Sequence, residues 1–139
     1  MRRMGNRRVV AGLAALLLLA LDPLPLSAAP GSWQGQVAPL RVARSDRPTC
    51  SEPLVPPPLA HGRQLAALRW SFRAPAGNRL QAWLCHAQRC AALPEHGGRG
   101  RNLTLAGLDA GQPLRFCFRL TADAAPQTIG DLQLLVDYR

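Results

Sequence analysis

The strongest constraint on the fold of this chain is a strict alternation of apolar and polar residues. Apolar side chains occupy every second position of segments 68–73, 114–120 and 132–138. Successive side chains of a strand point to opposite faces, so each segment predicts a half-buried strand. Helical periodicity is nearly absent after residue 30. The pattern therefore predicts an all-β fold.

Weaker strand signals and turn signals extend this pattern over residues 30–139. The weaker strands are expected at 37–42, 80–85, 89–93 and 101–108, and the turns at 75–78, 97–98, 109–111 and 126–130. Seven short strands at roughly ten-residue spacing are typical of a small antiparallel β-sandwich. Residues 45–61 hold five prolines, which cannot donate to a strand ladder. We expect one β-sandwich domain at 30–139 with an extended, polyproline-like loop at 45–61.

The first 29 residues have the pattern of a secretory signal peptide. Four arginines precede an apolar run at 9–21, and small residues follow at 27–29. The run is shorter than the stretch of about 20 apolar residues that spans a membrane. The sequence thus predicts a cleaved signal peptide at 1–29, cut after Ala28 or Ala29, and a periplasmic protein with no stable membrane insertion. A retained membrane anchor is the alternative.

All 17 basic residues are arginines, and lysine is absent. Residues 30–139 keep 13 arginines and 7 acidic residues, a net charge of about +6. The arginines are scattered along the sequence, whereas nucleic-acid binding favours clustered basic residues. An exported protein also rarely meets nucleic acid, so no nucleic-acid partner is expected.

The four cysteines predict two disulfides, because an even number in a small exported domain indicates a disulfide framework. Cys85 and Cys90 flank four residues that suit a hairpin turn, which brings them within bonding range. Cys117 lies on the polar face of its strand, where the Pro-rich segment with Cys50 can cross. Of the three possible pairings, we expect Cys85–Cys90 and Cys50–Cys117.

Zinc is the competing interpretation of these cysteines, because His86 and His96 lie near Cys85 and Cys90. The Cys-x4-Cys spacing fits no compact zinc-ligand pair, and export disfavours free thiolates. A thioredoxin-like site requires Cys-x-x-Cys, which is absent. Neither a metal nor another cofactor is expected.

Catalytic patterns are also absent from the sequence. It contains no Gly-x-Ser-x-Gly, no phosphate-binding glycine loop and no His-Glu-x-x-His, and the three histidines stand in turn-like contexts. We therefore expect no catalytic residues and no enzymatic activity. Two tryptophans are the candidate partner-binding residues, because Trp contributes strongly to interfaces. Trp33 either binds a partner or packs over the end of the sandwich, and Trp83 either covers a disulfide or stands exposed.

Five motifs together resemble the FlhE family of small periplasmic flagellar proteins. They are Gly31-Ser32-Trp33-Gln34, Leu68-Arg69-Trp70-Ser71-Phe72, Leu84-Cys85-His86-Ala87-Gln88-Arg89-Cys90, Pro113-Leu114-Arg115-Phe116 and Val136-Asp137-Tyr138-Arg139. The Pro-rich loop, Cys50 and Cys117 depart from the family pattern.

The resemblance implies a non-enzymatic accessory role in flagellar assembly. The expected partners are flagellar rod or hook components, bound in a chaperone-like way, or export-gate proteins at which the protein limits proton leak. A monomer is expected. The alternative classes are a periplasmic ligand-binding or lysozyme-inhibitor-like β-sandwich and a thiol-redox protein.

Overall fold

The computed structural model describes residues 30–75, 77, 79–94 and 98–139. The predicted signal peptide at 1–29 and part of the turn at 97–98 lie outside these residues. The described elements are nine strands and one short 3-10 helix. In chain order they are β1 Gly31–Val37, β2 Leu40–Val42, β3 Thr49–Cys50, η1 Pro58–Ala60, β4 Leu65–Arg73, β5 Leu80–Cys85, β6 Cys90–Ala92, β7 Arg99–Asn102, β8 Arg115–Leu120 and β9 Gln127–Tyr138.

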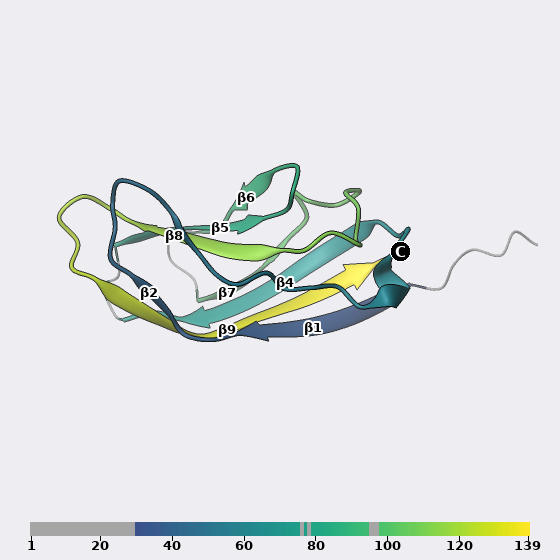
Figure 1. The fold of residues 1–139 in the computed structure, drawn as a ribbon, viewed down its shortest axis with the longest axis horizontal. Coiled ribbons are helices and arrows are strands. Elements are labelled where there is room, and N and C mark those ends of the chain that lie inside the picture. Colours follow the sequence, from purple (N-terminus) through teal and green to yellow (C-terminus); the bar gives the residue numbers. More distant parts are fainter. Residues whose placement is uncertain (1–29, 76, 78, 95–97) are drawn as a thin grey trace, which may run out of the picture.

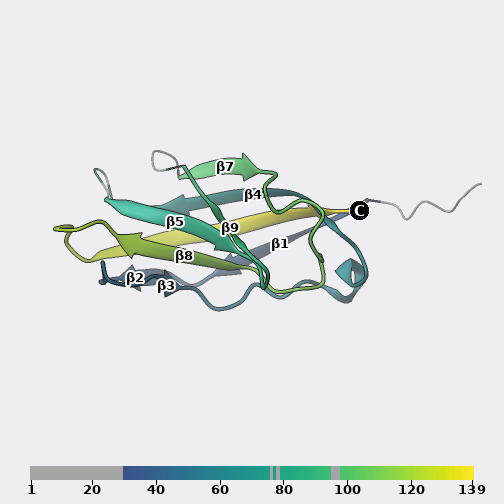
Figure 2. The ribbon, with the colours of Figure 1, turned by 90° about the horizontal axis from the view of Figure 1, so that it is seen from above.

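The strands form two antiparallel sheets that lie face to face (Figure 1). One sheet has the order β1-β9-β4-β7, and β2 also pairs with β9. The other has the order β3-β8-β5-β6. Figure 2 shows β7 at the edge of the first sheet, beyond β4. The prediction of an all-β antiparallel sandwich is thus confirmed.

The apolar core lies between the sheets, and the period of two decides which side chains enter it. From β8, Phe116 and Phe118 are fully buried, and β9 contributes Leu134 and Val136 in the same way. The Phe118 ring meets the Phe72 ring of β4 edge to face, with centroids 5.2 Å apart. Because alternate residues of each strand point away from the core, the outer faces of both sheets carry the polar side chains.

Strand β9 is the centre of the larger sheet. It pairs with β1 along its C-terminal half, with β2 near its start and with β4 on its other side. Its final residue Tyr138 is only 6% exposed. The next residue, Arg139, exchanges two backbone hydrogen bonds with Gln64, at 2.9 and 3.0 Å. The end of β9 is therefore fastened on both sides.

The expected number of seven strands is wrong, since the described residues form nine. Strand β1 does not show the apolar–polar alternation, because its inward positions include Gly31 and Gly35. A methyl group on Gly31 would meet the ring of Tyr138, and one on Gly35 would meet Leu54. The neighbouring side chains fill the space above these glycines, so β1 needs no large apolar residue there. The other missed strand, β3, is only two residues long.

The other differences lie at strand ends and have local causes. The predicted strand at 101–108 ends as β7 at Asn102, because the Asn102 side-chain oxygen accepts a hydrogen bond from the Thr104 N–H and bends the chain into an Asx-type turn. The predicted strand at 37–42 is shortened to β2, because Pro39, which lacks an N–H, separates β2 from Val37, the last residue of β1. The turn expected at 126–130 is instead the start of β9.

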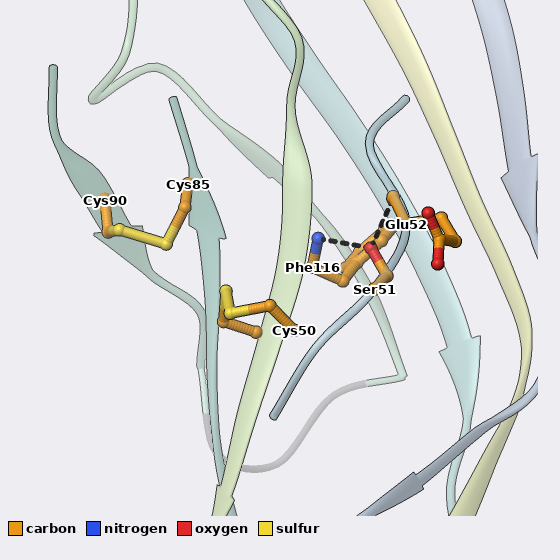
Figure 3. The surroundings of a disulfide bond; sticks show 7 residues. Cys50, Ser51, Glu52, Cys85, Cys90 and Phe116 are labelled. Atoms are coloured by element: carbon orange, nitrogen blue, oxygen red, sulfur yellow. Dashed lines mark hydrogen bonds between the residues drawn. A yellow bond between two sulfur atoms is a disulfide. The ribbon is translucent and has the colours of Figure 1, made fainter. Parts of the chain in front are cut away.

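The Pro-rich loop contains β3 and lies along the side of β8 opposite β5, as Figure 3 shows for Cys50, Ser51 and Glu52. The Ser51 N–H donates to the Phe116 carbonyl at 2.8 Å, and the Phe116 N–H donates to the Ser51 hydroxyl at 3.1 Å. Leu54 and Leu114 then exchange two backbone hydrogen bonds, at 2.7 and 3.1 Å. A serine hydroxyl thus replaces one backbone acceptor between the β3–β8 ladder and the Leu54–Leu114 pair.

Candidate functional site

The outer face of the four-stranded sheet carries both disulfides (Figure 3). Cys50 lies directly opposite Cys117 in the β3–β8 ladder, and Cys85 directly opposite Cys90 in the β5–β6 ladder. Both pairs have Cα atoms 4.0 Å apart, as suits the closely spaced pairs of an antiparallel ladder. This is the pairing expected from the sequence. Covalent bonds thus link β3 to β8 and β5 to β6.

Trp83 of β5 lies on this same outer face, beside the Cys50–Cys117 disulfide, because its cross-strand partner is Cys117. The Arg119 guanidinium lies 5.7 Å from the centroid of the Trp83 ring, within the range of a cation–π interaction. Arg119 also donates two hydrogen bonds to the Gln81 side-chain oxygen, at 3.1 and 2.6 Å. These contacts fix the positions of the Trp83 ring and the Arg119 guanidinium on a sheet whose strands are linked by disulfides. We call Gln81, Trp83 and Arg119 the Trp83 face.

Trp33 of β1 points inward, toward the core of the sandwich. Its cross-strand partner Val136 is fully buried, and Trp33 itself is half-buried against the core. Its indole nitrogen is buried, with no hydrogen-bond partner among the described residues. The structure therefore places the two predicted tryptophans on different sheets and does not bring them together. Partner binding by Trp33 and Trp83 stays a prediction.

A buried histidine, His86, connects the Cys85–Cys90 hairpin to a neighbouring loop. His86 is 6% exposed. Its Nε2 lies 2.8 Å from the Asp109 carbonyl, and its Nδ1 accepts from the Gln88 N–H at 3.2 Å. A carbonyl can only accept and an N–H can only donate, so the ring is neutral with its proton on Nε2. This geometry assigns His86 a structural role.

Replacing His86 with alanine should lower the free energy of unfolding by about 2 kcal/mol, because two hydrogen bonds and a buried ring are lost together. Urea unfolding followed by circular dichroism measures the change. The exposed His61 is the matched control, since His61→Ala should change the free energy of unfolding by less than about 0.5 kcal/mol. Equal effects of the two substitutions would contradict the structural role of His86.

The outer face of the five-stranded sheet carries a second group of polar residues. The register places Gln34, Leu135, Arg69 and Arg101 in one row across β1, β9, β4 and β7. The next row contains Gln133, Ser71 and Arg99. The two rows line a shallow hollow of about 630 Å³. We call Arg69, Arg99 and Arg101 the arginine face.

Sequence reasoning missed the arginine face because the cluster depends on strand pairing. Arg69 and Arg101 are 32 positions apart in the sequence, and only the β4–β7 register brings them opposite each other. The alternation of Arg99 and Arg101 around Gly100 was the one local signal. An Arg69–Asp137 ion pair of 3.0 Å balances part of the charge.

Other charged and metal-ligating residues are dispersed. Arg44 donates two hydrogen bonds to the Asp46 carboxylate and thereby lowers the pKa of Asp46 to about 2. This exposed pair lies at the start of the Pro-rich loop. Its contribution to stability is complete above the ordinary pKa of Asp, 3.8, and is lost as the pH falls from there through about 2. Within residues 30–139, apart from the undescribed positions, no cluster of three metal-ligating side chains occurs. No helix in the described part is long and apolar enough to cross a membrane.

Comparison with known proteins supplies a family and a fold. A family model described as "Flagellar protein FlhE" matches residues 42–139. A solved structure described as "Crystal Structure of FLHE" has a TM-score of 0.66 and 24% identity, and the match covers 81% of this chain and 99% of that chain; at this identity it supports the fold. A cyanophage Pam1 capsid structure has a TM-score of 0.48 and 9% identity over 85% of this chain and 91% of its own, which carries no argument. No curated protein matches the chain.

Proposed function

The chain belongs to the FlhE family of flagellar proteins, and from this premise we propose that it is a non-enzymatic accessory protein that works in the periplasm. Its proposed task is to bind rod or hook components in a chaperone-like way while they wait to assemble. Unassembled subunits expose apolar surface and strand edges that self-associate. A folded protein can cover such surface without ATP and without chemistry.

The observation that best supports this task is the Trp83 face. Trp and Arg side chains dominate the energetics of protein interfaces, and here both lie on one outer face. Both side chains lie on the β5–β8 ladder. The Cys50–Cys117 bond links β8 to β3 on one side of this ladder, and the Cys85–Cys90 bond links β5 to β6 on the other. A contact surface that is already rigid loses little conformational entropy on binding. We propose this face as the contact for the exported subunits.

Trp83→Ala should weaken binding to purified rod subunits roughly tenfold or more, because a central aromatic contact is removed. The measurements are subunit aggregation by light scattering and affinity by calorimetry. Leu59→Ala is the matched control, since Leu59 is an apolar side chain in the Pro-rich loop that is 76% exposed. An equal effect of both substitutions would argue against the Trp83 face as the contact.

A deletion strain tests the wider proposal. Loss of the protein should cause flagellar material to misassemble in the periplasm or protons to leak through the export gate, which cytoplasmic pH measurements detect. Normal flagella together with normal cytoplasmic pH would contradict both roles. Inhibition of lysozyme by the purified protein would then favour the alternative of an inhibitor-like β-sandwich.

A further inference from the structure

We infer that the free edge of β7 binds an extended acidic segment of a partner protein, which adds to the five-stranded sheet as an antiparallel strand. This inference rests on the proposed function, because it specifies the kind of segment that a flagellar subunit would present. It concerns a different surface from the Trp83 face. Three properties of β7 support it: its unpaired edge, its charge and its lack of bulk on the inner side.

Among the described strands, β7 has one edge with no pairing partner, because of its place in the sheet. Strand β7 is the last strand of the order β1-β9-β4-β7 (Figure 2). The Phe72 N–H donates to the Gly98 carbonyl at 2.6 Å, so the alternating ladder directs the main-chain groups of Gly100 toward β4. The main-chain N–H and carbonyl groups of Arg99 and Arg101 consequently point away from the sheet. They are positioned to pair with an added strand.

The charge of β7 determines which strand can pair there. Arg99 and Arg101 are both exposed, and neither forms an ion pair with any residue in the described part of the chain. In an antiparallel ladder, residues directly opposite in a hydrogen-bonded pair have Cα atoms about 5.5 Å apart. Acidic side chains at alternate positions of an added strand would therefore lie beside these two guanidinium groups. Opposite charges in cross-strand pairs are stabilising.

The inner side of β7 carries little bulk. Its inward positions are Gly100 and Asn102, the partners of Trp70 and Leu68 of β4, and the Asn102 side chain accepts a hydrogen bond from the nearby Thr104 N–H. A methyl group on Gly100 would lie 2.8 Å from the Trp70 ring, so the indole occupies the space directly behind this glycine. The alternate side chains of an added strand would approach glycine and the edge of the core. The complementary segment thus alternates acidic and apolar residues.

The same arginines exclude other strands. A basic or uncharged strand would meet two unneutralised cations or would desolvate them without compensation. Like charges also oppose edge-to-edge pairing of two copies of this chain through β7, a common protection of exposed edges. The charge of β7 therefore provides specificity for an acidic segment, through repulsion as well as attraction.

The test uses the full disulfide-bonded protein and a synthetic seven-residue peptide of alternating Glu and Val. Isothermal calorimetry should detect binding of this peptide and none of the Lys–Val peptide. The double substitution R99E/R101E should weaken binding at least tenfold. R41E/R47E makes the same change in net charge away from β7 and should weaken binding less than threefold. Equal effects of the two double variants would overturn the inference.

Backbone methylation tests strand addition separately from charge. In the inferred register the Glu N–H groups point at β7 and the Val N–H groups point away. Methylating the Glu nitrogens should abolish binding, whereas methylating the Val nitrogens should preserve it within threefold. Equal loss or equal retention would show that the peptide does not bind as a strand.

The two proposals can fail separately. If the protein slows subunit aggregation but the Glu–Val peptide does not bind, the β7 inference is wrong and the proposed function stands. If the peptide binds in the stated way but subunit aggregation is unaffected, the proposed function is wrong and the acidic-strand site stands. Self-association of R99S/R101S without peptide binding to the unsubstituted protein would reduce the two arginines to edge protection and overturn the inference.

Discussion

Deleting residues 132–139 should leave the chain unfolded. The deletion removes Leu132, Leu134, Val136 and Tyr138, which are at most 6% exposed. It also removes most of the ladder that joins β1 to β4 through β9. Each buried side chain of this size stabilises the fold by about 1.5–3 kcal/mol, and four together approach the 5–15 kcal/mol typical of a whole domain. Far-UV circular dichroism and urea unfolding measure the outcome.

Deletion of Arg139 alone is the control. It removes the two hydrogen bonds to Gln64 and leaves β9 complete, so this variant should fold with a modest loss of stability. A 132–139 deletion that stays soluble with an unchanged far-UV spectrum would contradict the central role of β9.

Replacing Cys50 and Cys117 together with alanine should lower the free energy of unfolding by about 4 kcal/mol. The bond joins residues 67 positions apart, and a disulfide that closes a long loop restricts the unfolded chain strongly. The Cys85–Cys90 pair spans only 5 positions, so removing it should cost about 2 kcal/mol. Urea unfolding of the two double variants against the oxidised protein gives both values.

The second disulfide is thus the matched control for the first. Equal losses from the two double variants would contradict the loop-length argument. Non-reducing peptide mapping checks the pairing itself, and a peptide that joins Cys50 to Cys85 or Cys90 would show that the pairing is wrong.

The strands with large apolar residues could be predicted from sequence because the period of two is a local property. Segment 68–73 lies within β4, segment 114–120 contains β8, and segment 132–138 lies within β9. Strand β1 could not be predicted in this way, since Tyr138 and Leu54, distant in sequence, fill the space above its glycines. In β1, side chains from distant parts of the sequence fill the core positions that the strand's own apolar side chains fill elsewhere.

The features of the candidate surfaces also differ in whether local sequence or distant contacts determine them. The disulfide pairing could be predicted because a short hairpin and one crossing segment determine it. The contact between Trp83 and Arg119, and the row formed by Arg69 and Arg101, depend on strand register. Register is set by the hydrophobic pattern of the paired strands and by turn geometry, and so cannot be read from one segment alone. In the sequence the arginines are therefore scattered, whereas in the fold Arg69, Arg99 and Arg101 lie together on the outer face of one sheet.

The position of β9 also sets the order in which the protein can fold. A ribosome makes β9 after all three of its partners, β1, β2 and β4. Among the described strands, β1 and β2 have no other pairing partner. The larger sheet cannot assemble until residues 127–138 have emerged from the ribosome. Such non-local pairing folds slowly, in milliseconds to seconds, which leaves the two edge strands without partners for a time after β9 has been made.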